Sequence, residues 1–121
     1  MIKYAADKRY SDECAATHDS YTHSAVSASK LFEAISTIDL ATLDVIGVDE
    51  GQFYPDLVEF SESMANQGKV VIVSALDGTF QRKPFGAVLE LIPLAERVDK
   101  FSAVCMCCQN SAAFTSRYHF L

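Results

Sequence analysis

The feature that most constrains the fold is a strand–helix–strand pattern between residues 43 and 74. Leu43–Val48 (LDVIGV) and Lys69–Ser74 (KVVIVS) are short runs rich in β-branched residues, which favour strands. Between them, Pro55 opens a segment with apolar residues at helical spacing, and Gly68 ends it. Because branched apolar residues point to both faces of the strand at 43–48, we predict a parallel sheet with helices covering both sides.

The rest of the chain alternates in a similar way, so the whole sequence predicts an α/β fold. We expect, in chain order, a strand at Ile2–Ala5, an exposed loop at 11–23, an amphipathic helix at Ser24–Ile38, a helix at Phe85–Val98 and a buried strand at Phe101–Val104. The helix at 85–98 must bend or break at Pro93, because proline removes a backbone donor.

Composition limits the classes of function. The chain has 121 residues, of which 50% are hydrophobic, enough for one domain with a substantial core. Its net charge of −6 argues against a broad basic face for nucleic-acid polymers or anionic membranes. Without a signal-peptide pattern or a run of about 20 apolar residues, we expect a cytoplasmic protein. Its cysteines are then expected to be metal ligands or free thiols.

Two acidic residues follow the first strand of the central pattern. Asp49 and Glu50 stand directly after Val48, and Gly51 and Gln52 come next. In parallel sheets, ligands bind beyond the carboxyl ends of the strands, so the loops DEGQFYP and LDGTFQRKPFG should face one site. Such an acid pair can hold Mg²⁺ and accept a proton in phosphoryl transfer, although a merely solvated strand end is the alternative.

The second loop combines aromatic and basic residues. Phe80 and Phe85 lie near Arg82 and Lys83, so rings could sandwich a nucleobase while cations meet phosphate. Phenylalanines that reach back into the core are the alternative. The phosphate-binding pattern G-x-x-x-x-G-K-[ST] does not occur, and Gly68-Lys69 is predicted to be a turn.

A cysteine motif follows residue 104. Cys105 and Cys108 have the C-x-x-C spacing of half a tetrahedral zinc site. A redox-active dithiol and a pair of free thiols are the alternatives, since the second half of a zinc site is not evident in the sequence.

Several blocks together resemble the cytosolic-type thymidine kinase family. They are KYAADKRYS, THD, VIGVDEGQFYPDLVEFSESMANQGKVVIVSALDGTFQRKPFG and AVCMCC, in this order. The resemblance implies part of a P-loop-kinase-like (RecA-like) parallel sheet flanked by helices, with the remnant of a small zinc-binding lasso domain. It also implies transfer of the γ-phosphate of ATP to the 5′-hydroxyl of deoxythymidine with Mg²⁺, and possible homo-oligomers.

The resemblance also assigns roles to individual residues. Glu50 matches the proton acceptor. The metal and phosphate side is matched by Asp49, Gln52, Asp7 and Arg9. The thymidine side is matched by Leu76, Phe80, Phe53, Phe85, Thr115 and Arg117. Cys105 and Cys108 match the first half of the family's structural zinc site.

The chain departs from the family pattern at both ends. The family's phosphate loop, its lasso loop and its second C-x-x-C have no match here, so we expect a truncated form with residues 1–104 in the kinase domain and 105–121 opening the lasso domain. Losing the phosphate loop should reduce activity by orders of magnitude. The alternatives are a non-catalytic isoform that joins full-length subunits and an incomplete gene model.

Overall fold

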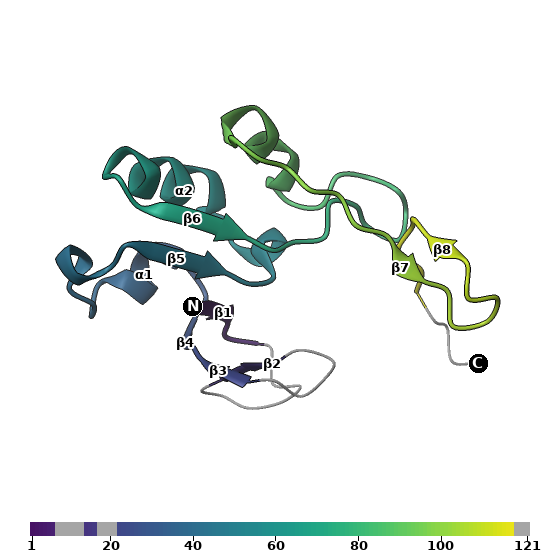
Figure 1. The fold of residues 1–121 in the computed structure, drawn as a ribbon, viewed down its shortest axis with the longest axis horizontal. Helices are drawn as coiled ribbons and strands as arrows, with labels where there is room; N and C mark the ends of the chain where they lie inside the picture. Colours follow the sequence, from purple (N-terminus) through teal and green to yellow (C-terminus); the bar gives the residue numbers. More distant parts are fainter. Residues whose placement is uncertain (7–13, 17–21, 118–121) are drawn as a thin grey trace.

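The computed structural model describes residues 1–6, 14–16 and 22–117. In this part of the chain the main element is a four-stranded parallel sheet with the order β4-β1-β5-β6 (Figure 1). Its strands are β1 (Ile2–Tyr4), β4 (Val26–Ala28), β5 (Val45–Val48) and β6 (Val70–Val73). Helices α1 (Leu31–Ile35) and α2 (Leu57–Asn66) pack against the sheet. The predicted α/β class with a parallel sheet is confirmed.

The other elements are short. Two antiparallel hairpins are formed by β2 (Cys14–Ala16) with β3 (Thr22–Ser24) and by β7 (Ala103–Val104) with β8 (Ser111–Ala112). The 3-10 helices are η1 (Leu40–Thr42), η2 (Gly51–Phe53) and η3 (Val88–Leu94). Figure 1 shows the β7–β8 hairpin at the end of a long segment that leads away from the parallel sheet.

The unit β5-α2-β6 forms where the sequence predicts it. The two strands pair in parallel, with Val45 beside Val70. Helix α2 begins at Leu57 and ends before Gly68, whose φ of +80° is a conformation that glycine adopts without strain. Lys69 then leads into β6, so the pair Gly68-Lys69 is a turn, as predicted.

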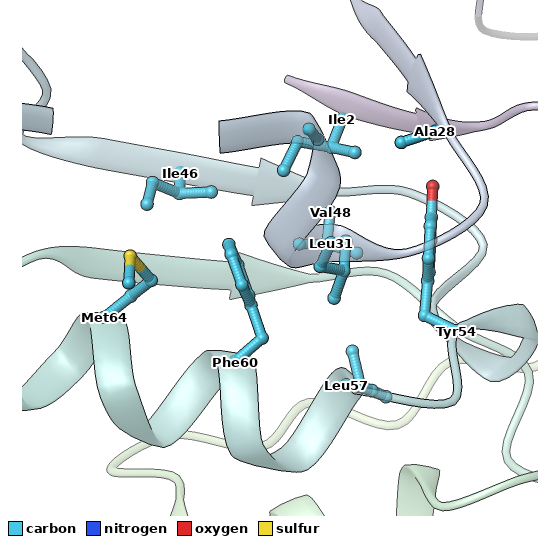
Figure 2. Packing of buried hydrophobic residues seen from close by; sticks show 10 residues of the cluster. Ile2, Ala28, Leu31, Ile46, Val48, Tyr54, Leu57, Phe60 and Met64 are labelled. Carbon is cyan, nitrogen blue, oxygen red and sulfur yellow. The ribbon is translucent and has the colours of Figure 1, made fainter. Parts of the chain in front are cut away.

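Both helices cover the same face of the sheet and form the core with it. Figure 2 shows side chains of α2 pointing toward Leu31 and toward β5. The buried apolar residues are Ile2, Ala28, Leu31, Ala34, Ile46, Val48, Tyr54, Leu57, Phe60 and Met64. The Asp56 carboxylate accepts hydrogen bonds from the backbone N–H groups of Leu31 and Phe32, at 3.1 and 3.0 Å. These donors open α1, so Asp56 ties the starts of the two helices together.

The opposite face of β5 and β6 is open in the described part of the chain. The side chains of Val45, Val70 and Ile72 are 53%, 55% and 60% exposed. The prediction that helices cover both sides is therefore wrong here. Branched apolar residues on both faces of a strand indicate that both faces favour burial, but they do not specify what covers them.

The predicted helix at Ser24–Ile38 is wrong in its first half. Val26–Ala28 forms β4, and only Leu31–Ile35 is α-helical. The N–H of Val26 donates to the carbonyl of Met1, and the N–H of Ala5 donates to the carbonyl of Ala28, both at 3.0 Å. Pairing with a strand more than twenty residues earlier therefore outweighs the local helical spacing.

Two predictions near the carboxyl end also need correction. Phe101–Val104 was predicted as a buried strand, but only Ala103–Val104 is extended, and it pairs antiparallel with β8 while both residues are exposed. The predicted helix at Phe85–Val98 is the shorter 3-10 helix η3, which contains Pro93 and ends one residue later. Strand β7 thus pairs with β8 instead of extending the sheet, and η3 packs against α2.

The expected loop at 11–23 overlaps the β2–β3 hairpin, so the loop prediction is wrong at Cys14–Ala16 and from Thr22 onward. The remaining residues of that loop lie outside the described residues. Within the described ranges, no helix has the length and apolar character needed to cross a membrane.

Candidate functional site

The acid pair lies at the carboxyl-end edge of the parallel sheet. Asp49 directly follows β5, and its backbone N–H donates to the carbonyl of Ile2 in β1 at 2.9 Å. One oxygen of the Asp49 carboxylate accepts the N–H of Glu50 at 3.0 Å. Both acidic side chains are half-buried. The strand end thus holds two adjacent carboxylates at the position where parallel sheets bind ligands, as predicted.

Glu50 is held in an unusual conformation by its neighbours. Its φ of 53° and ψ of 45° lie in the left-handed region, which is uncommon for residues other than glycine. The Gln52 side-chain amide donates to the Glu50 carboxylate at 2.6 Å. The carbonyl oxygen of the same amide accepts the backbone N–H of Leu76 at 3.1 Å. Gln52, only 5% exposed, therefore connects the acid pair to the segment after β6.

Two glycines allow the loops to approach each other, and the sequence interpretation gave Gly86 no role. A Cβ on Gly86 would lie 2.6 Å from the carbonyl oxygen of Gln52, and Gly86 also has a φ of +55°. A Cβ on Gly51 would lie 2.7 Å from a methyl carbon of Val73, while its N–H donates to the carbonyl of Ser74 at 2.9 Å. The Pro-Phe-Gly sequence at 84–86 was the available signal for Gly86.

Three aromatic rings connect the first loop to the second and to β1. Phe53 stacks on Tyr4 with ring centroids 4.9 Å apart and meets Phe85 edge-on at 5.5 Å. Phe53 remains partly exposed, and Phe85 is half-buried. These rings and the Gln52–Leu76 hydrogen bond bring the two loops into contact, while their shared site stays a prediction. Tyr4 is a member of this group that sequence reasoning missed.

The loop after β6 closes on itself. The N–H of Phe85 donates to the carbonyl of Asp77 at 3.0 Å, and Gly78 pairs with Pro84. The Asp77 carboxylate accepts a hydrogen bond from the Lys100 ammonium group at 2.7 Å, which lowers the pKa of Asp77 below its usual value. Asp77-Gly78 is thus part of a turn, as predicted, and is also joined to the distant Lys100.

Phe80 lies in this loop and contacts Arg117. The Phe80 ring is partly exposed, and the Arg117 guanidinium lies over it, 5.5 Å from the ring centroid. Leu76, whose N–H meets Gln52, is also partly exposed. Thr115 is exposed. Asp7 and Arg9 lie outside the described residues.

The cysteine motif forms the turn between β7 and β8. The Cys105 N–H donates to the carbonyl of Asn110 at 2.8 Å, and the Gln109 N–H donates to the carbonyl of Cys105 at 2.9 Å. Backbone N–H groups of Cys108 and Cys107 lower the pKa of the Cys105 thiol by stabilising its thiolate. The side chains of both residues lower this pKa further.

Cys105 should react at lower pH than an ordinary thiol. Since its pKa is lowered, the thiolate that attacks iodoacetamide is present at a lower pH. We expect the pH midpoint of Cys105 alkylation, measured by peptide mass spectrometry with a chelator present, to fall below the usual thiol range near 8.5. A midpoint within that range would contradict the hydrogen-bond arrangement of the turn.

The two candidate metal sites differ in how well their donors fit. Mg²⁺ is commonly held by one or two carboxylates together with waters and substrate phosphates, so Asp49 and Glu50 suit it. Structural zinc takes four ligands, and Cys105 with Cys108 supplies two. In the described part of the chain, no three His, Cys, Asp or Glu side chains are grouped to hold a metal ion.

Comparison with known proteins identifies the family of this chain. The thymidine kinase family model matches residues 1–120. The chain is 57% identical over 117 residues to the cytosolic thymidine kinase of Homo sapiens. This match covers 97% of the chain and 49% of the human protein. It is 54% identical over 116 residues to the thymidine kinase of variola virus, and covers 64% of the viral protein. The chain thus spans about half to two thirds of the length of these relatives, and it belongs to the thymidine kinase family.

Proposed function

We propose that this chain takes part in the transfer of the γ-phosphate of ATP to the 5′-hydroxyl of deoxythymidine. One observation carries the proposal beyond family membership. The Gln52 side chain bonds the Glu50 carboxylate at 2.6 Å and the Leu76 N–H at 3.1 Å. These bonds fix Glu50, which is suited to accept a proton, relative to Leu76, which matches the nucleoside side of the family's site.

Within this proposal, Glu50 accepts the proton of the 5′-hydroxyl as the phosphorus–oxygen bond forms. Asp49, with Gln52, acts on the metal and phosphate side, together with Asp7 and Arg9. Mg²⁺, when bound, neutralises charge on the phosphates. An adjacent acid pair suits this division, because one carboxylate can serve the metal while the other takes the proton.

We propose that the two loops form the side of the site that binds the nucleoside. Phe80 would stack on thymine, and Leu76 would form the adjacent wall. Phe53 and Phe85, in edge-on contact at 5.5 Å, would flank the base. Thr115 and Arg117 would complete this side, and the position of the Arg117 guanidinium over Phe80 supports a link between the two segments.

The remaining proposals rest on family membership and the sequence. They are a P-loop-kinase-like (RecA-like) core over residues 1–104, a zinc-binding lasso segment over 105–121 that uses Cys105 and Cys108, a cytoplasmic location and homo-oligomers. The turn that brings Cys105 and Cys108 together supports the zinc proposal. Its hydrogen bonds to sulfur would also stabilise thiolate ligands.

Nuclear magnetic resonance of the protein with thymidine would test the nucleoside site. We expect magnetisation transfer from the thymine methyl group to the Phe80 ring, and chemical-shift changes confined to residues 49–55, 76–86 and 115–117. If thymidine leaves the chemical shifts of these residues unchanged, or changes only those of residues on other surfaces, the proposal is wrong.

A further inference from the structure

Tyr54 has a buried hydroxyl group that the proposed reaction does not use. The side chain is 2% exposed. Among the side-chain polar atoms of the described residues, this hydroxyl oxygen is buried without a hydrogen-bond partner. Buried polar groups are nearly always paired, because losing water without a new partner destabilises the fold. Phenylalanine would fill almost the same space without this penalty.

The hydroxyl points toward the carboxyl-end edge of the sheet. The Tyr54 backbone is fixed, because its N–H donates to the carbonyl of Gly51 at 3.2 Å. Figure 2 shows the ring extending from the segment before α2 toward Ala28, the last residue of β4, with the oxygen at its far end. The ring meets Tyr4, the last residue of β1, edge-on at 5.6 Å.

Charges at this edge act on the hydroxyl. Burial raises the pKa of Tyr54 most, and the carboxylate of Asp49 raises it more than any other charged group, ahead of Tyr4, Asp56 and Glu50. The hydroxyl therefore keeps its proton and remains a donor. The Asp49 backbone is held to Ile2 of β1, so its carboxylate belongs to the same edge.

We propose that the hydroxyl of Tyr54 positions the Asp49 carboxylate, by donating a hydrogen bond to it directly or through one ordered water, when Asp49 holds a divalent cation. The inference rests on the metal-side role proposed for Asp49. Carboxylates that bind metal ions are usually hydrogen-bonded by a second group, which orients them and sets the affinity. A buried donor at the same edge of the sheet fits that requirement.

The test is a titration with Mn²⁺, a paramagnetic substitute for Mg²⁺, followed by electron paramagnetic resonance of the unbound ion. We expect Tyr54→Phe to weaken Mn²⁺ binding about tenfold, as for other groups that orient metal ligands. The melting temperature without metal should stay the same or rise, because an unpaired hydroxyl is removed.

An Asp49→Asn variant separates this inference from the proposal on which it rests. We expect Asp49→Asn to weaken Mn²⁺ binding, and Tyr54→Phe to have no further effect in that background. If Asp49→Asn weakens binding and Tyr54→Phe does not, the inference fails while the role of Asp49 stands. If neither variant changes binding, both fail. A lower melting temperature for Tyr54→Phe without metal would also overturn the inference, because it would indicate a purely structural role.

Discussion

Replacing Glu50 with glutamine is expected to slow phosphate transfer to thymidine by about 10²–10⁴-fold, the usual effect of losing a general base. Glutamine has nearly the same size as glutamate and can still accept a hydrogen bond from Gln52, which donates to Glu50 at 2.6 Å. It cannot take up the proton of the 5′-hydroxyl. The rate should be measured with radiolabelled ATP, and the dissociation constant for thymidine should change by less than about threefold.

Glu62→Gln is the matched control for this substitution. Glu62 is exposed on α2, away from the sheet edge that carries the acid pair, and the same chemical change there should leave the transfer rate unaltered. A Glu50→Gln protein that keeps the unsubstituted rate would show that Glu50 is not the proton acceptor.

Replacing Phe60 with alanine is expected to lower the free energy of unfolding by about 3–5 kcal/mol. The Phe60 side chain is fully buried between α2 and the sheet (Figure 2), and its ring meets Phe32 of α1 edge-on at 5.3 Å. Alanine would leave a cavity where both helices meet β5. Since small domains have total stabilities of only about 5–15 kcal/mol, urea denaturation should reveal a large loss.

Phe101→Ala provides the control with the same chemical change. Its side chain is 87% exposed, so truncation should change the unfolding free energy by less than about 0.5 kcal/mol. Equal losses from Phe60→Ala and Phe101→Ala would contradict the core described for α1, α2 and the sheet.

The predictable part of the fold is the part in which local signals agree. In β5-α2-β6, β-branched runs, helical spacing and Gly68 all point to the same elements, and each lies within a few residues of the next. Strand β4 was missed because its pairing with β1 lies outside any local window. Phe101–Val104 has strand composition as well, but composition does not tell a buried parallel strand from an exposed hairpin.

Some features of the candidate site could likewise be predicted from the sequence, and others could not. The position of Asp49 and Glu50 could be predicted, because an acid pair after a parallel strand must lie at the carboxyl-end edge. The Gln52 bridge to Leu76 and the close approach of Gly86 depend on how two loops meet, which no local pattern encodes. The buried hydroxyl of Tyr54 likewise becomes evident only from its surroundings.

The role of Glu50 and the identity of the substrate are tested most directly by following radiolabelled γ-phosphate from ATP onto thymidine. The protein should come from a host without thymidine kinase, with Glu50→Gln purified in parallel to exclude contaminating activity. We predict labelled thymidine 5′-monophosphate from the unsubstituted protein and a rate about 10²–10⁴-fold lower from the variant. Labelled product formed at equal rates by the two proteins would contradict the proposed chemistry.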